Sequence, residues 1–219
     1  AEKKQITNFS VEKKIDANLQ KKLATSGEID FLLVVDFGYL VPSWLLKLPK
    51  IAPLNIHPSL LPKWRGSSPG QFALLFKNLA GETTQSAVTL MVMNEGLDQG
   101  PIITQLPFKI EENWTQNEYY EQAFTLMAEK LADLIDSLAQ GKIIAQDQPL
   151  ESPTITARRL SKEDSFVAWS DLQKLMQAGL EKIRLSETST ANPSLLSSLL
   201  ANEEICKDKR EQIQLIINS

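Results

Sequence analysis

Short apolar runs separated by polar turns predict a strand, a helix and a second strand early in the chain. Residues 31–35 (Phe-Leu-Leu-Val-Val) are all apolar and are followed by Asp36, which is typical of a strand buried on both faces of a parallel sheet. Residues 42–48 begin with a proline and predict a short helix, and residues 54–57 predict the next strand. Together these segments indicate a βαβ unit, in which the two strands run parallel.

Apolar residues at helical spacing predict three more helices. Residues 11–23 carry such residues four positions apart. A second helix starts at Pro69, behind a serine that can cap it. The longest helix opens at Thr115, which forms a capping box with Glu118, and it ends at Gly141. These helices alternate with apolar strand segments, which indicates an α/β fold.

Two further strands are predicted between the second and the longest helix. Residues 87–93 form the first, and residues 94–100 form a loop with two glycines after it. Residues 102–110 form the other strand. Pro107 lies within it and cannot donate a ladder hydrogen bond, so we expect this strand at the edge of the sheet.

The composition changes after residue 150, and this change predicts the domain organisation. Residues 1–150 form one α/β domain. Residues 151–169 are polar and contain Pro153, which predicts a linker laid over that domain. Residues 170–219 include a low-complexity break and predict only a short helical segment.

Charge and composition narrow the classes of partner. The 219 residues carry 23 Lys and Arg against 27 Asp and Glu, a net charge of −4, which argues against general nucleic-acid binding by counterion release. No apolar run approaches the ~20 residues that a membrane helix needs. The single cysteine, Cys206, cannot form an internal disulfide. We therefore expect a cytoplasmic protein without a membrane partner.

The only histidine, His57, stands at the predicted end of a strand, where ligands bind in α/β sheets. Asn55 lies two residues earlier and points to the same side, because side chains alternate along a strand. Asp98 follows the next strand, in the glycine loop. A carboxylate can orient an imidazole, and an amide can donate to a carbonyl oxygen that gains negative charge, so the three suit acyl transfer to an amine. A lone histidine can equally be a satisfied core residue or a surface residue.

Other catalytic patterns are missing from the sequence. It contains no G-x-S-x-G elbow, no Walker lysine loop and no metal-ligand cluster, so we expect no metal. The apolar segment after His57 is too irregular for the interior of a helix or strand. A loop of this kind needs something to pack against, and a flat heterocyclic ligand would serve.

Two motifs, in this order and with a helix between them, resemble those of the formyltransferases that use 10-formyltetrahydrofolate. They are Asn55-x-His57-x-Ser59-Leu60-Leu61-Pro62-x-x-Arg65-Gly66 and Glu95-Gly96-Leu97-Asp98-x-Gly100. The continuation Arg65-Gly66-Ser67-Ser68-Pro69-x-Gln71, with residues 160–169, resembles the methionyl-tRNA formyltransferases of that superfamily. The resemblance extends from about residue 1 to about residue 183.

This resemblance implies a Rossmann-like, mostly parallel sheet and a catalytic trio of Asn55, His57 and Asp98. It implies transfer of the formyl group of 10-formyltetrahydrofolate to the amine of initiator methionyl-tRNA, by a cytoplasmic monomer. Arg65 would contact the folate tail or tRNA phosphates, unless it is a solvated loop charge. The implied folate-binding residues are Val35, Phe37, Ser59, Leu60, Leu61 and Pro62.

The chain also departs from the family pattern. It enters that pattern only one strand-helix-strand unit before Asn55, so we expect the first βαβ unit of the sheet to be missing and a sheet edge to be exposed. Residues from 184 onward show no alternating strands where the family has a β-barrel that helps to hold tRNA. Asp36 stands where the family usually has a small residue, and Gln99 where it has Thr or Ser; we expect Asp36 to be benign.

Two alternatives to the tRNA enzyme remain open. The segments 55–59 and 100–103 also resemble glycinamide ribonucleotide formyltransferase, although the Arg65-Gly66 continuation favours the tRNA enzyme. The other alternative is a folate-binding remnant without catalytic activity.

Overall fold

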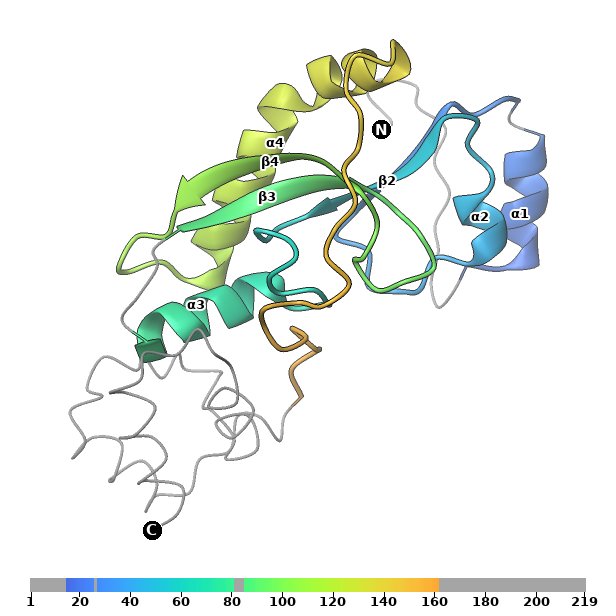
Figure 1. Ribbon diagram of the computed structural model, residues 1–219. Coiled ribbons are helices and arrows are strands. Elements are labelled where there is room, and N and C mark those ends of the chain that lie inside the picture. The colour runs from blue at the N-terminus through green and yellow to red at the C-terminus, as the bar shows by residue number, and fades with distance from the viewer. Residues whose placement is uncertain (1–14, 26, 81–84, 162–219) are drawn as a thin grey trace, which may run out of the picture.

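The computed structural model describes residues 15–25, 27–80 and 85–161, and they form a four-stranded sheet with helices (Figure 1). The strands lie in the order β1-β2-β3-β4. Their bounds are Phe31–Val35 for β1, Ala52–His57 for β2, Gln85–Val92 for β3 and Ile102–Lys109 for β4. The predicted strands are thus confirmed, with β2 and β3 each beginning two residues earlier than expected.

The sheet is mixed. β1 pairs with β2 in parallel, whereas β3 is antiparallel to both β2 and β4. Three of the four strands therefore run in the same direction, which agrees with the mostly parallel, Rossmann-like sheet expected. Pro107 of β4 lies opposite Ala87 of β3. β4 is an edge strand of the described sheet, as its proline predicts.

The helices are α1 (Ala17–Ala24), α2 (Ser43–Leu46), α3 (Pro69–Ala80) and α4 (Gln116–Ala139). Of the predicted helix over residues 11–23, residues 11–14 lie outside the described residues. In the described part the helix starts at Ala17, because the Asp16 carboxylate caps it and accepts hydrogen bonds from the backbone of Asn18 and Leu19. The capping box of α4 is confirmed, since the Thr115 backbone N–H donates to the Glu118 carboxylate at 2.6 Å.

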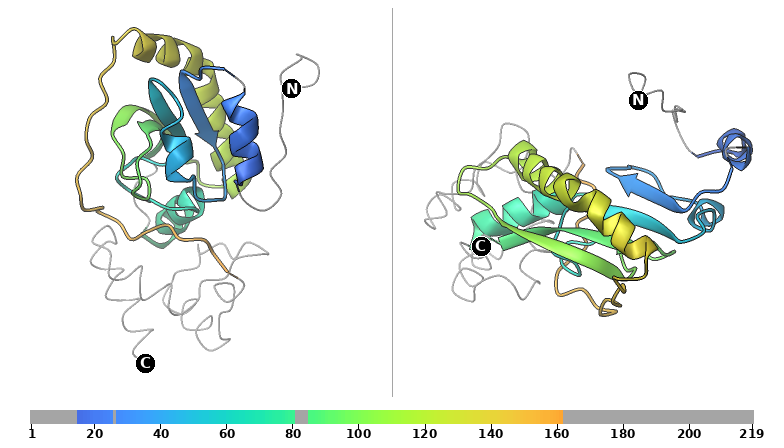
Figure 2. Two further views of the ribbon diagram at one scale, coloured as in Figure 1. Left: turned by 90° about the vertical axis from the view of Figure 1, so that its right-hand side faces the viewer. Right: turned by 90° about the horizontal axis from the view of Figure 1, so that it is seen from above.

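One hydrophobic core lies between the sheet and helices α3 and α4. Helix α4 packs across β3 and β4 and also contacts α3 (Figure 2). Leu54 of β2, Leu90 of β3, Phe72 of α3 and Met127 of α4 are all fully buried in it. Burial of each such side chain stabilises the fold by roughly 1.5–3 kcal/mol, so this core holds the end of β2 in place.

Strand β1 differs from its prediction. Its first four residues are only half-buried, and Val35 keeps 44% of its surface exposed. The reason is its position, because β1 is the edge strand opposite β4 and pairs only with β2 among the described strands. An apolar run predicts burial on both faces, but the neighbours decide how far this burial extends.

Residues 140–161, the described segment after α4, cross the sheet on the side away from that helix (Figures 1 and 2). We call this extended segment the strap. Within it, Ala157 exchanges backbone hydrogen bonds with Arg65 and Ser68, and the Thr154 hydroxyl accepts from the Trp64 backbone N–H at 2.8 Å. Only glycine fits at position 66, because a Cβ there would overlap the Ala157 carbonyl. Residues 151–161, the described part of the predicted linker, therefore contact the loop after β2, and the division of the chain into a domain, a linker and a C-terminal segment stays a prediction. Residues 162–169 and the predicted segment 170–219 lie outside the described residues.

Two further findings concern the described residues only. No helix among them is long and apolar enough to span a bilayer. No group of three or more His, Cys, Asp or Glu side chains in this part of the chain is arranged to hold a metal ion.

Candidate active site

A cavity of about 660 Å³ opens where β2 ends. The loop between β1 and α2, the end of β2, the loop after β3 and one side of α4 form its walls. Asn55, His57 and Asp98 all line it, so the fold brings the predicted trio to one place. Its volume lies within the range typical of small-molecule sites, about 300–1,000 Å³.

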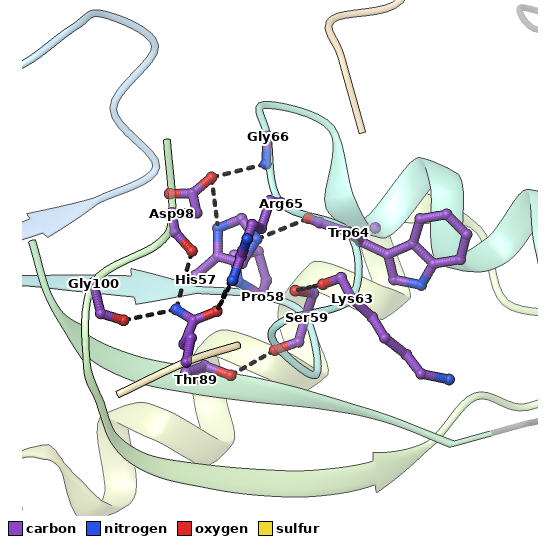
Figure 3. Close-up of polar contacts among 12 residues, drawn as sticks. His57, Pro58, Ser59, Lys63, Trp64, Arg65, Gly66, Thr89, Asp98 and Gly100 are labelled. Atoms are coloured by element: carbon purple, nitrogen blue, oxygen red, sulfur yellow. Dashed lines mark hydrogen bonds and ion pairs between the residues drawn. The ribbon is translucent and has the colours of Figure 1, made fainter. Parts of the chain in front are cut away.

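His57 is buried, with only 4% of its surface exposed, and both of its ring nitrogens face polar groups (Figure 3). Nε2 lies 3.0 Å from the backbone oxygen of Trp64. A carbonyl oxygen only accepts, so Nε2 must carry a hydrogen and donate it. Nδ1 is therefore the nitrogen available to exchange a proton, and it lies 3.7 Å from Oδ2 of Asp98.

The Asp98 carboxylate contacts the loop after β2. Its Oδ2 accepts a hydrogen bond of 2.8 Å from the backbone N–H of Gly66 (Figure 3). The distance to His57 Nδ1 exceeds that of a hydrogen bond, so the pair is an ion-pair contact when the imidazole is protonated. The spacing leaves both groups able to face a substrate atom that enters the cavity.

Three non-glycine residues around the site have left-handed backbones, with φ of 46° at Asp36, 59° at Trp64 and 50° at Asp98. This conformation is uncommon for residues with a Cβ and is held by surrounding contacts. Each has a place at the site, since Asp36 and Asp98 line the cavity and the Trp64 carbonyl accepts the hydrogen bond from His57 Nε2. Backbone strain is therefore concentrated where the polar groups converge.

Asn55 lies on β2, beside Val34 of β1 and Met91 of β3. It is partly buried and borders the cavity. Within the described part of the chain, no hydrogen bond to its side-chain amide is found. This amide can donate to a substrate oxygen in the cavity.

The mouth of the cavity is apolar. Phe37 and Tyr39 lie with their ring centroids 5.5 Å apart, and Leu40 and Leu97 stand beside the opening with 90% and 51% of their surface exposed. The sequence predicted Phe37 as a ligand-binding residue, and it does line the cavity. Apolar walls around a polar floor suit a flat ring system that carries a reactive polar group.

The other residues predicted to bind folate do not line this cavity; they are Val35, Ser59, Leu60, Leu61 and Pro62. Ser59 is fully buried, donates to the Lys63 carbonyl at 2.7 Å and accepts from the Thr89 hydroxyl at 2.6 Å (Figure 3). The Leu61 carbonyl accepts from the Gln105 amide. The loop therefore packs on β3, β4 and the strap, and it supports the site from behind.

Arg65 makes its observed contacts within the chain. It is 5% exposed and absent from the cavity wall. Its guanidinium donates to the side chain of Gln148 and to the carbonyls of Pro149 and Leu150, at 2.7–3.3 Å. Burial lowers the pKa of Arg65, and the nearby Asp98 carboxylate opposes this shift. Arg65 thus holds the strap against the site, and its contact with the folate tail or tRNA phosphates stays a prediction.

The sequence model of the formyl transferase family matches residues 1–135, which is more than half of the chain. This chain belongs to the formyl transferase family. The trio and the cavity described above lie within the matched residues.

Four curated relatives of this chain are all named methionyl-tRNA formyltransferase. The chain is 35% identical over 141 residues to the methionyl-tRNA formyltransferase of Geotalea uraniireducens, covering 64% of this chain and 43% of that protein. Three further relatives with the same name are 28–33% identical. The chain spans only about half of the length of these curated relatives, between 43% and 53%.

Two solved structures share the fold. The formyltransferase PseJ from Anoxybacillus kamchatkensis, in complex with a UDP-linked formamido sugar and tetrahydrofolate, is 25% identical with a TM-score of 0.52, over 68% of this chain and 71% of that one. Glycinamide ribonucleotide transformylase 1 from Symbiobacterium toebii is 24% identical with a TM-score of 0.51, over 61% and 62%. The formyl transferase fold is thus shared by enzymes with different names.

Helix α4 contributes a residue that the sequence prediction missed. Tyr120 lines the cavity, donates its hydroxyl hydrogen to the Gln71 side chain at 2.7 Å and accepts from the Gly70 backbone. Burial raises the pKa of Tyr120 to about 12, and the Asp36 carboxylate adds to this rise. Its position in the amphipathic stripe of a helix gives no sign of a site residue, because such stripes usually form the core.

Proposed function

We propose that this chain transfers a formyl group from 10-formyltetrahydrofolate to the amine of methionyl-tRNA. The observation that supports this most is the meeting of Asn55, His57 and Asp98 in one cavity, with His57 Nδ1 3.7 Å from the Asp98 carboxylate. An amide, an imidazole and a carboxylate together provide an oxyanion donor and a proton acceptor, which acyl transfer to an amine requires.

The shape of the cavity supports a folate as the formyl donor. Its mouth carries the Phe37 and Tyr39 rings and Leu40, and its floor carries the polar trio. A flat heterocycle can pack on the apolar walls while its formyl group lies over the floor. The related PseJ was solved with tetrahydrofolate, in agreement with this class of donor.

Each of the three side chains then has one part in the chemistry. The amine nitrogen bonds to the formyl carbon, the bond from that carbon to the folate nitrogen breaks, and the proton lost by the amine ends on that nitrogen. Asn55 donates to the formyl oxygen as it gains negative charge. His57 carries the proton through Nδ1, because the Trp64 carbonyl occupies Nε2. Asp98 stabilises the charged imidazole.

Methionyl-tRNA is the proposed acceptor because the relatives that match at 28–35% identity carry that name. The proposal includes a cytoplasmic location and a monomeric protein.

A glycinamide ribonucleotide is the second candidate acceptor, since the segments 55–59 and 100–103 also resemble glycinamide ribonucleotide formyltransferase. The cavity also carries the carboxylates of Asp36 and Glu95, which suit an acceptor that presents an ammonium or amide N–H near the amine.

Replacement of His57 by Ala tests the proposal. We expect turnover to fall by about 10²–10⁴-fold, while folate affinity measured by calorimetry stays close to that of the unaltered chain. Lys130→Ala, on the exposed side of α4, is the control for expression and folding. Near-normal turnover in His57→Ala would overturn the assignment.

The acceptor is tested by supplying methionyl-tRNA and glycinamide ribonucleotide in separate assays with 10-formyltetrahydrofolate. Product from methionyl-tRNA supports the proposal, and product from the nucleotide alone would replace it. Folate binding without transfer to either acceptor would instead support the folate-binding remnant.

A further inference from the structure

A glutamine 50 residues away in the sequence holds the loop that carries Asp98. The Nε2 amide of Gln148 donates to the backbone oxygens of Asp98 at 3.0 Å and Gly100 at 2.7 Å. Its Oε1 atom accepts from Nη2 of Arg65 at 2.9 Å and from Nε at 3.3 Å. The partners fix which end of the amide is which, because carbonyls only accept and a guanidinium only donates.

Both ends of this contact are anchored. Arg65 also donates to the carbonyls of Pro149 and Leu150, so the guanidinium fits closely around the Gln148 segment. The strap itself joins β4 at Gln146, which exchanges backbone hydrogen bonds of 2.7 and 2.8 Å with Ile102. Gln148 therefore links the loop after β2 to the loop after β3, with little freedom at either end.

The loop that Gln148 holds needs such support. Asp98 is left-handed, with φ of 50°, and its carboxylate has to stay near His57 while it accepts from the Gly66 N–H. The Arg65, Asp98 and Gly100 groups converge beside His57 in Figure 3. Without Gln148, the Asp98 and Gly100 carbonyls would lose a shared donor, and the loop could relax toward an ordinary backbone conformation.

We propose that Gln148 is a positioning residue that sets the distance between Asp98 and His57 through its two contacts with the loop. This inference rests on the proposed formyl transfer and assigns a part of that site to the strap. Gln148 does not line the cavity, so it acts through Asp98 and not on the substrate.

The first test measures kinetics in the full chain. Gln148→Leu removes all four contacts, and Gln148→Glu keeps an acceptor for Arg65 but removes both donors to the loop. We expect kcat to fall about 10- to 100-fold in both variants, with a smaller change in KM for the folate. Gln146→Ala is the matched control, because the Gln146 side chain is exposed and only its backbone pairs with β4. Wild-type kcat in Gln148→Glu would overturn the proposal.

The second test does not depend on activity. His57 is the only histidine, so its imidazole resonances in an NMR spectrum need no separate assignment. We expect them to shift in Gln148→Leu and Gln148→Glu and to stay in place in Gln146→Ala. Unchanged resonances in folded Gln148 variants would show that Gln148 does not position this pair. If the unaltered chain transfers no formyl group, the proposed function fails, and the NMR comparison still decides whether Gln148 holds the His57 and Asp98 groups together.

Discussion

The Asp98 carboxylate and the His57 imidazole approach to 3.7 Å, and the same carboxylate oxygen accepts from the Gly66 backbone at 2.8 Å. One oxygen therefore serves two purposes, because it ties two loops together and places a negative charge beside Nδ1. Structure and chemistry can be separated at this position, since an amide can replace the first role but not the second.

Asp98→Asn should lower turnover by about 10²–10⁴-fold and leave the free energy of unfolding within about 1 kcal/mol. Asparagine tolerates the left-handed backbone of this position and can still accept from Gly66. Alanine neither favours the left-handed backbone nor accepts from Gly66, so Asp98→Ala should also destabilise the fold by about 1–3 kcal/mol. Steady-state kinetics and urea unfolding of both variants check this. Equal stability of the two variants would contradict the role given to the Gly66 contact.

Local sequence signals predict much of this fold because they depend on neighbouring residues. The run at residues 31–35 becomes β1 with its expected bounds, and the Thr115 capping box starts α4. Asn55 and His57 share one side of β2 because side chains alternate along a strand. The place of Asp98 could not be predicted in this way, because β3 runs antiparallel to β2 and ends opposite Leu54, and Asp98 lies beside His57 only through the fold of the loop after β3.

The contacts that the sequence did not predict depend on partners distant in the sequence. The irregular apolar loop at Ser59 to Pro62 indicates that it needs a packing partner, but not which one, and that partner is the sheet and strap. Arg65 looks like a ligand-binding cation, yet its acceptors lie 83–85 residues further along. Gln148 lies just before the predicted linker, where no local pattern identifies its contacts.

Gly100→Ala should destabilise the chain by about 1–3 kcal/mol. A Cβ at Gly100 would overlap the carbonyl oxygen of Val92, and backbone must move to make room. Gly38→Ala is the matched control, because a Cβ there meets nothing within 4 Å. Chemical unfolding of the two variants measures the difference. Equal stability would mean that the loop after β3 can shift freely, which would also weaken the argument for a fixed Asp98.

Tyr119→Phe should lower the free energy of unfolding by about 1–3 kcal/mol. The Tyr119 hydroxyl is fully buried, donates to the Pro58 carbonyl at 2.9 Å and lies 2.6 Å from the Ser86 hydroxyl. Phenylalanine leaves these two oxygens with one partner fewer in a place that water does not reach. Tyr120→Phe is the control, since its hydroxyl is only part-buried, and we expect a loss of about 1 kcal/mol or less. A smaller loss at Tyr119 than at Tyr120 would contradict this ranking.

The stability of the chain should fall above pH 10 because its buried tyrosines resist ionisation. Burial raises the pKa of Tyr120 from 10.0 to about 12, and burial also raises the pKa of Tyr119. Between pH 10 and about 12 the unfolded chain releases the Tyr120 proton while the folded chain retains it, so the unfolded state binds fewer protons and a rise in pH favours it. The stabilisation lost should be on the order of 2 kcal/mol. Urea unfolding at several alkaline pH values, with tyrosinate absorbance as a second signal, measures this loss. Tyr120→Phe should reduce it, and an unchanged alkaline loss in that variant would show that another group causes it.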